Sequence, residues 1–169
     1  ERFETHLQTM GMWFSISVYS PGKEYFVAVF DVITERKLAE EKLKSSQRLL
    51  TETERIGRVG GWEFNIDTGK QTWTDEVYRI HELDTTFDPT VDEGVNFYAP
   101  ASRPIIEGAV KRTIEQGEPF DLELEIITAK GNPRWVHAIG KANLENRRVS
   151  GFFQDITERK LAEEKLKVE

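Results

Sequence analysis

The sequence predicts an α+β protein, in which antiparallel strands and helices form separate blocks of the chain. Between residues 57 and 157 the pattern reads as two strands, then helical segments, then three strands. The twelve residues 33–44, ITERKLAEEKLK, recur unchanged at 156–167, and an identical run of this length indicates an internal repeat. A strand-like apolar run leads into each copy. A unit that ends in a strand and a charged helix therefore occurs twice.

Composition limits the classes of protein to which this chain can belong. Its 169 residues, 38% hydrophobic and 11% aromatic, are sufficient for a packed core. The net charge of −7 argues against binding to nucleic acid and against docking on an anionic membrane. With no cysteine, the chain cannot form disulfides, use a catalytic thiolate, bind zinc through cysteine or form a cysteinyl–flavin adduct.

The sequence also bears on location and extent. No apolar stretch approaches 18 residues, so we expect no membrane contact by this chain. The lack of cysteine is compatible with a reducing cytoplasm, which is the location we expect. Because the sequence starts at Glu1, without Met, in a strand-like segment, we expect it to be part of a longer protein.

The first 33 residues predict three antiparallel strands. In the second of these, Phe14, Ile16 and Val18 alternate with serines, as in a half-buried strand. The strands are expected at 2–8, 12–19 and 25–33, with a turn at 20–23. Three strands alone cannot bury a core. We therefore expect this piece to pack against a second chain or against the sheet of the complete domain.

A helix is predicted from Thr34 to about Ile56. Thr34 is a good N-cap, and Glu35 suits the positive end of the helix dipole. Alternate steps of four and three residues, as in the seam of a two-stranded coiled coil, separate Ala39, Leu43, Ser46, Leu50 and Thr53. This spacing predicts a parallel dimer contact. The alternative is an amphipathic linker helix that lies on its own domain.

Residues 57–157 predict a complete α+β unit. The turn Asp67-Thr68-Gly69 separates two strands, and Thr74 or Asp75 caps a short helix. A loop with short helical turns is expected at 84–99, before a longer helix that Gly117 ends. The strands are expected at 61–67, 70–74, 120–129, 134–143 and 147–156, and the helices at 75–83 and 100–116.

Several motifs of this unit occur in an order that resembles a known family. They are GWEF at 61–64, WTDEVYRI at 73–80, GNPRWV at 131–136 and GFFQDITERK at 151–160. Over residues 59–157 the chain resembles a PAS sensor domain with a PAC-type C-terminal half, a form common in archaeal and bacterial sensory histidine kinases. The resemblance implies a five-stranded antiparallel sheet with helices on one face, a pocket between them, and flanking signalling helices.

Residues 1–33 resemble the last three strands of another PAS domain. Met12-Trp13-Phe14 stands where Arg134-Trp135-Val136 stands in the second unit. The expected organisation is a truncated PAS domain at 1–33, a linker or coiled-coil helix at 34–56, a complete PAS domain at 57–157 and the start of an output helix at 158–169.

The resemblance implies a role in signal relay for the strand–helix junctions. Asp155-Ile156-Thr157 resembles the family's terminal signature, with Thr157 expected to cap the outgoing helix and Asp155 to hold the junction by a hydrogen bond or an ion pair. Thr34 is the corresponding residue of the first copy. There Val32 occupies the position of Asp155, and Asp31 falls one residue earlier, on the opposite face of the strand.

A ligand pocket is the second candidate site. Its expected lining is Trp73, Tyr78, Phe97, Ile106, Val110, Ile126, Trp135, His137 and Phe152. The aromatic residues could stack on a flavin, although such residues more often belong to the core. His81 or His137 could bind haem, although a surface histidine or one with satisfied hydrogen bonds is the commoner case. We expect no cofactor, with flavin or haem as the alternatives.

Three functions remain open on these grounds. The first is a sensory and dimerisation module, with no catalysis of its own, that feeds a histidine kinase or another output domain and forms a homodimer. The second is a flavin- or haem-bound sensor of redox state or light. The third is a structural interaction domain with a filled core. The sequence contains no catalytic constellation and no metal-binding motif.

Overall fold

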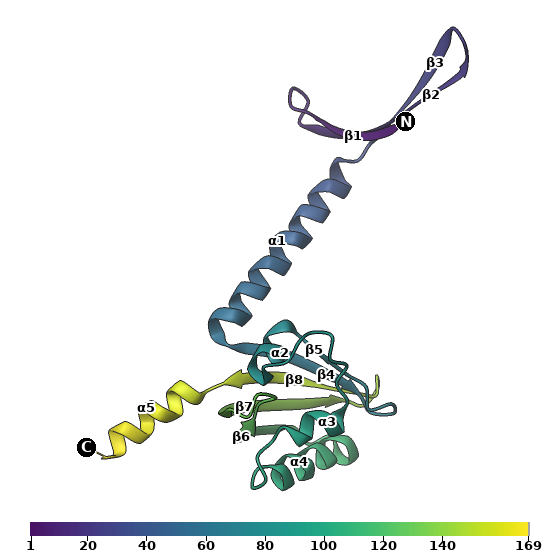
Figure 1. The fold of residues 1–169 in the computed structure, drawn as a ribbon. Helices are drawn as coiled ribbons and strands as arrows, with labels where there is room; N and C mark the ends of the chain where they lie inside the picture. The colour runs from purple at the N-terminus through teal and green to yellow at the C-terminus, as the bar shows by residue number, and fades with distance from the viewer. Residues whose placement is uncertain (169) are drawn as a thin grey trace. The chain divides into compact units, whose positions relative to one another are not determined.

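A computed structural model describes residues 1–168 of the chain, which divide into two compact units (Figure 1). Unit 1 is Glu1–Thr51 and unit 2 is Glu52–Glu169. Among the described residues, no helix combines the length and the apolar character that crossing a membrane requires.

Unit 1 is a three-stranded antiparallel sheet followed by a helix. The strands β1 (Arg2–Leu7), β2 (Met12–Gly22) and β3 (Tyr25–Val32) are ordered β1-β2-β3. The predicted turn lies slightly later than expected, because β2 continues through Pro21 before the chain reverses. The helix α1 (Thr34–Gly57) begins in unit 1 and continues into unit 2.

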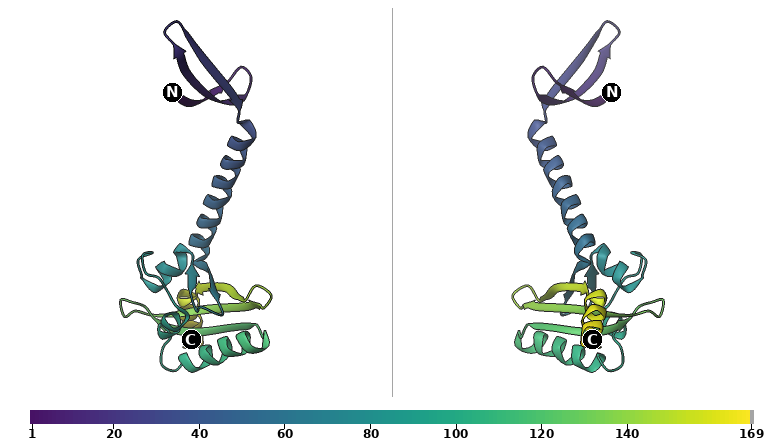
Figure 2. Two further views of the ribbon diagram at one scale, coloured as in Figure 1. Left: turned by 90° about the vertical axis from the view of Figure 1, so that its right-hand side faces the viewer. Right: turned by 90° about the vertical axis from the view of Figure 1, so that its left-hand side faces the viewer.

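Unit 2 is a five-stranded antiparallel sheet with α2, α3 and α4 on one face, as the sequence predicts (Figures 1 and 2). The strand order is β5-β4-β8-β7-β6. The elements are β4 (Val59–Asn65), β5 (Gln71–Trp73), α2 (Asp75–His81), α3 (Val91–Asn96), α4 (Arg103–Gln116), β6 (Phe120–Ile127), β7 (Pro133–Asn143), β8 (Arg148–Asp155) and α5 (Thr157–Val168).

The alternation of side chains along the strands separates the covered face of this sheet from the open one. On β6, Leu124 and Ile126 are buried beneath the helices, whereas Glu123 is exposed. On β7, Val136 and Ala138 are buried on the same face. A period of two therefore decides which residues line the space between sheet and helices.

Local signals end the helices near the predicted positions. Glu82 adopts a left-handed conformation, with φ of 57°, after α2, and Gly117 does so after α4. Thr90 and Glu93 form a capping box at the start of α3, which is a short helix inside the predicted loop. These caps fix the ends of the helices that cover the sheet.

Two glycines allow backbone and side chains to approach closely inside unit 2. A Cβ atom at Gly60 would lie 2.4 Å from Val77 Cγ2 and 2.7 Å from its backbone nitrogen. A Cβ atom at Gly151 would lie 1.7 Å from the carbonyl oxygen of Ile139 on the neighbouring strand. Any larger residue at these positions must therefore push elements apart.

The Gly60 contact yields a direct test of packing. We expect Gly60→Ala to lower the free energy of unfolding of unit 2 by about 1–3 kcal/mol, since the added methyl group overlaps the start of α2. Gly61→Ala is the matched control, because its Cβ atom would meet Thr74 Cγ2 at 3.5 Å and the carbonyl oxygen of Gly151 at 4.0 Å, both ordinary contacts. Urea unfolding of both variants measures the difference, and equal stabilities would contradict the packing described.

Candidate functional site

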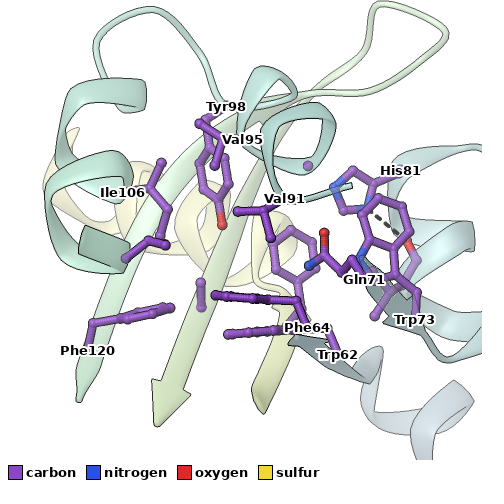
Figure 3. A pocket seen from close by; sticks show the side chains of 15 residues that line it. Trp62, Phe64, Gln71, Trp73, His81, Val91, Val95, Tyr98, Ile106 and Phe120 are labelled. Carbon is purple, nitrogen blue, oxygen red and sulfur yellow. Dashed lines mark hydrogen bonds between the residues drawn. The ribbon is translucent and has the colours of Figure 1, made fainter. Parts of the chain in front are cut away.

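A cavity of about 50 Å³ lies between the sheet and the helices of unit 2 (Figure 3). Its wall is apolar apart from a few groups, among them the amide of Gln71 and the imidazole of His81. The lining residues come from both strands and helices and are Trp62, Phe64, Gln71, Trp73, Val77, His81, Val91, Gly94, Val95, Tyr98, Ile106, Val110, Phe120, Ala138 and Phe153.

His81 is the most unusual residue of this wall. Its side chain is 2% exposed, and its ring stacks between Trp73 and Phe153, with ring centroids 4.6 and 4.9 Å away. Nδ1 donates a hydrogen bond of 2.8 Å to the carbonyl oxygen of Val77, so the proton of the neutral ring is on Nδ1. Burial lowers the pKa of His81 to about 4; the bond to Val77 opposes this shift and the charge of Arg134 adds to it.

The cavity does not fit a flavin or a haem. Pockets that hold ligands of this size have volumes of roughly 300–1,000 Å³, several times that of this cavity. The space is filled by rings: Trp62 stacks on Phe64 and on Phe120, each at 6.0 Å between centroids. Haem ligation by His81 would also require room beside a ring that is stacked on both faces. Among residues 1–168, no group of three histidine or carboxylate side chains could hold a metal ion.

The residues expected to line the pocket fall into three groups. Trp73, Ile106 and Val110 line the cavity. Tyr78, Phe97 and Ile126 belong to the same core without reaching the cavity. Trp135, His137 and Phe152 lie on the opposite face of the sheet.

The third group differs from expectation because of strand alternation. Ala138 pairs with Phe153, and both are buried beneath the helices, so their neighbours His137 and Phe152 point to the other side. Phe152 is 60% exposed there, and His137 is hydrogen-bonded to Asp121 at 2.5 Å. A shift of one residue along each strand exchanges the two faces.

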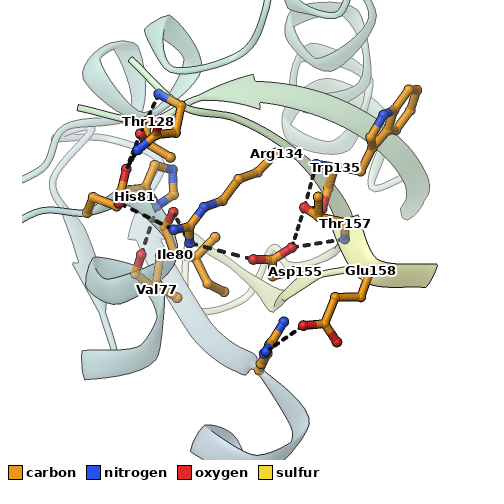
Figure 4. Close-up of polar contacts among 12 residues, drawn as sticks. Val77, Ile80, His81, Thr128, Arg134, Trp135, Asp155, Thr157 and Glu158 are labelled. Atoms are coloured by element: carbon orange, nitrogen blue, oxygen red, sulfur yellow. Dashed lines mark hydrogen bonds and ion pairs between the residues drawn. The ribbon is translucent and has the colours of Figure 1, made fainter. Parts of the chain in front are cut away.

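The junction between β8 and α5 is a second candidate site (Figure 4). Asp155 Oδ1 accepts hydrogen bonds from the backbone N–H of Thr157, at 3.0 Å, and from its hydroxyl, at 2.6 Å. The Thr157 oxygen in turn accepts the backbone N–H of Trp135 on β7, at 3.0 Å. Asp155, rather than Thr157, thus satisfies a backbone N–H at the start of the helix, whereas Thr157 links the helix to the sheet.

Arg134 connects this junction to the end of α2. Its guanidinium lies 3.5 Å from Asp155 Oδ2 and 3.4 Å from Glu82 Oε1, and it donates a hydrogen bond of 3.1 Å to the carbonyl oxygen of Ile80. Hydrogen bonds from Thr128 and Asn132 hold the Glu82 carboxylate and lower its pKa. A chain of polar contacts therefore runs from α2 to α5 (Figure 4).

Glu82 and Arg134 belong to this network, although neither residue was predicted to take part in a site. Glu82 directly follows His81, which lines the cavity, and it is the first residue in the chain of polar contacts that leads to α5. No sequence motif marks that relation, because the left-handed turn at Glu82 and the approach of β7 to α2 are tertiary features.

The backbone of the same junction recurs in unit 1. There Thr34 Oγ1 accepts the backbone N–H of Trp13 at 3.0 Å, and Ile33 N–H donates to Trp13 O at 2.9 Å. In unit 2 the bond from Ile156 to Trp135 O also measures 2.9 Å. The two copies of the repeat are thus attached to their sheets in the same way.

The charged residues of the repeat also act alike in the two units. Lys37 lies over the Trp13 ring at 5.1 Å and pairs with Glu4 at 2.5 Å. Lys160 lies over the Trp135 ring at 5.1 Å and pairs with Glu123 at 2.6 Å. In each unit the preceding arginine pairs with the same glutamate. What unit 1 lacks is the carboxylate, since Val32 stands where unit 2 has Asp155.

The low pKa of His81 predicts a pH-dependent stability. The unfolded histidine, with a pKa near 6.5, binds a proton that the folded one excludes down to about pH 4. The free energy of unfolding should therefore fall, as the pH is lowered from about 6.5 to about 4, by up to about 1.4 kcal/mol per pH unit from this group. Urea unfolding at several pH values measures this slope.

The variant His81→Phe provides the comparison for that slope. It keeps an aromatic ring between Trp73 and Phe153 but cannot titrate. We expect its stability to depend less steeply on pH than that of the unaltered protein over this range. Identical slopes, or an NMR titration of the His81 ring with a midpoint near 6.5, would contradict the neutral, buried state.

Comparison with known proteins places unit 2 in a family. Residues 69–152 match a family model described as the PAS fold. A crystal structure of a sensory box histidine kinase/response regulator from Burkholderia thailandensis superposes with a TM-score of 0.58 at 25% identity, over 70% of this chain and 92% of that one.

Two curated relatives are much longer than this chain. It is 32% identical over 137 residues to a blue-light-activated histidine kinase of Brucella ovis, covering 76% of this chain and 26% of the relative. It is 25% identical over 146 residues to the probable diguanylate cyclase DgcE of Escherichia coli, covering 84% of this chain and 13% of the relative. The chain thus spans about a quarter or less of either protein. With the fold, the family match and these relatives in agreement, unit 2 of this chain belongs to the PAS family of signalling sensor domains.

Proposed function

We propose that the chain is the sensory and dimerisation module of a multidomain signalling protein and that its output leaves through α5. The observation that carries this proposal is the position of Asp155. It contacts the first residue of α5 and, through Arg134, the end of α2. A movement of α2 against the sheet would change the contacts that hold α5 at its start.

The path begins beside the cavity. His81 lines the cavity, and the next residue, Glu82, pairs with Arg134 at 3.4 Å. Arg134 pairs with Asp155, which holds Thr157. In this proposal Asp155 and Thr157 form the relay of unit 2. Thr34 is the corresponding residue of unit 1, without a carboxylate partner at position 32.

The incoming and outgoing helices are also connected at the sheet of unit 2. Asp155 N–H donates a hydrogen bond of 3.0 Å to the carbonyl oxygen of Arg58, the residue after α1. The Arg58 guanidinium pairs with Glu158, in the first turn of α5, at 2.9 Å. The end of one helix and the start of the other thus share a single junction. This supports a role in passing a signal along the chain.

We further propose that α1 forms a parallel coiled coil in a homodimer. None of its residues is buried, and Leu38, Leu43 and Leu50 are exposed on the apolar stripe. Leu43 and Leu50 are one heptad apart in the predicted seam, whose remaining positions are the small or polar Ala39, Ser46 and Thr53. A seam with so few large apolar residues supports only a weak dimer. A weak helix–helix contact can rearrange when a signal is passed along the chain.

The output domain that we propose is a histidine kinase in the cytoplasm. Two of the similar proteins named above are histidine kinases and one is a probable diguanylate cyclase. The proposal rests on the first two. Unit 2 itself would contribute no catalytic group, and its part in the kinase would be to bias the arrangement of the helices that follow α5.

A specific observation favours the filled-core interaction domain over a flavin or haem sensor as the second candidate. The cavity of about 50 Å³ is lined by stacked rings, and no cysteine is available to a flavin. If the blue-light response of the Brucella ovis kinase depends on a bond between a flavin and a cysteine, this chain has to sense a different signal. A domain whose core is filled would respond to a partner that binds to its outer surface.

The cavity volume predicts the spectrum of the protein. The purified chain should show no visible absorbance, since neither chromophore can be accommodated in a space this small. Absorbance spectroscopy, followed by mass spectrometry of the supernatant after denaturation, checks this. A stoichiometric flavin or haem would overturn it and restore the second of the three functions.

The relay proposal is tested by removing the carboxylate. In Asp155→Val, which copies Val32 of unit 1, the backbone amides of residues 157–160 should exchange hydrogen faster, because the start of α5 loses a cap worth about 1 kcal/mol. Asp121→Val is the matched control, because Asp121 lies on β6, which is separated from β8 by β7, and its carboxylate is hydrogen-bonded to His137 rather than to α5. Equal exchange in the two variants would contradict the role of Asp155.

The dimer proposal predicts a change of mass. Sedimentation of the 169-residue chain should reveal a dimer, and Leu43→Lys with Leu50→Lys should convert it to a monomer, because four lysines would meet in the seam. Glu41→Lys with Arg48→Glu, which changes two charges outside the seam, is the control. A monomeric unaltered chain at all concentrations would remove the support for the coiled coil.

A further inference from the structure

The two faces of the three-stranded sheet of unit 1 differ in composition. One is almost entirely apolar, whereas the other mixes charged and hydroxyl side chains with Trp13, Val27 and Val29. Along β2, Phe14, Ile16 and Val18 share a face, and Ser15 and Ser17 share the other. The pairing of the strands places further large apolar residues on the first face, and most are exposed: Phe3, Leu7, Phe26, Phe30 and Val32. Exposed apolar patches of this kind mark an interaction surface.

The register of the strands identifies this surface. In unit 1 Ile16 pairs with Phe30, and in unit 2 Ala138 pairs with Phe153. The two sheets are aligned by their common junctions, in which Trp13 and Trp135 hold the repeat in the same way. The apolar face of unit 1 is therefore the counterpart of the face that α2, α3 and α4 cover in unit 2.

The contrast in exposure at matched positions is large. Phe30 is 61% exposed, whereas its counterpart Phe153 is 4% exposed beneath the helices. Ile16 is half-buried, whereas Ala138 is 1% exposed. The apolar face of unit 1 thus has the same strand register as the covered face of unit 2, but it lacks the layer of helices that buries that face.

The edge of the sheet provides a second, independent observation. In unit 2, β8 pairs on one side with β7 and on the other with β4, which is followed along the chain by β5 and then by α2. In unit 1, β3 pairs with β2 alone among the described residues and leaves its other edge open. An open edge next to an apolar face is a binding surface for a strand as well as for helices.

We propose that the apolar face and the open β3 edge of unit 1 bind a strand-and-helix segment of the same kind as β4–α4, supplied by another part of the longer protein. The occupant would add a strand to β3 and place helices with aliphatic and aromatic side chains on Phe14, Ile16 and Phe30. In unit 2 the helix residues that share the buried core with Phe153 include Val77, Ile80 and Ile106. A second copy of the chain, sheet against sheet, would cover the face but leave the edge open.

Single cysteines can test this occupant because the chain has none of its own. Phe30→Cys places a thiol on the proposed binding face, and Val29→Cys places one on the opposite face of the same strand. Each variant is alkylated with iodoacetamide in the isolated 169-residue chain and in the full-length protein, and the modified peptide is quantified by mass spectrometry. Circular dichroism confirms that both variants fold.

In the full-length protein we expect Cys at position 30 to react at least ~10-fold more slowly than Cys at position 29, since a covered thiol reacts only when the layer opens. In the isolated chain both should react rapidly, at every protein concentration. Equal rates in the full-length protein would overturn the proposal. Protection of position 30 in the isolated chain that disappears on dilution would overturn it too, because a second copy would then be the occupant.

Discussion

The backbone of one tryptophan determines where each helix leaves its sheet. The N–H of Trp135 is bound by the hydroxyl of Thr157, and its carbonyl oxygen is bound by the N–H of Ile156. Both contacts lie at the point where β8 ends, so the first turn of α5 cannot move without disturbing β7. Trp13 is used in the same way. On the sheet side these bonds involve only main-chain groups. Substitutions of side chains in the strands therefore leave the attachment of the helix in place.

Side chains add to this attachment a coupling that differs between the units. Asp155 links the start of α5 to Arg134, and Arg134 reaches the carbonyl oxygen of Ile80 at the end of α2. In unit 1 the corresponding residues are Val32 and Met12, neither of which can form an ion pair. The attachment of the helix is thus shared by both units, and the connection to a covering helix is specific to unit 2.

Most of the fold could be predicted from local patterns, and much of the site could not. The five strands and the main helices follow from alternation, caps and glycine stops, and the family motifs gave their order. The face of each strand was harder to assign, because Trp135 and Phe152 are as apolar as Val136 and Phe153, which are the buried ones. The roles of Glu82 and Arg134 depend on contacts between residues about 50 positions apart, which a single sequence does not reveal.

The identity of the two helix starts has a consequence for how such proteins change in length. All the groups by which the repeat holds its sheet, namely the threonine, arginine and lysine, lie within the twelve shared residues. A crossover anywhere inside the repeat would join the sheet of unit 1 directly to α5, remove 123 residues and leave every one of these contacts in place. Modules with this junction can be gained or lost in the genome without a new connection having to evolve.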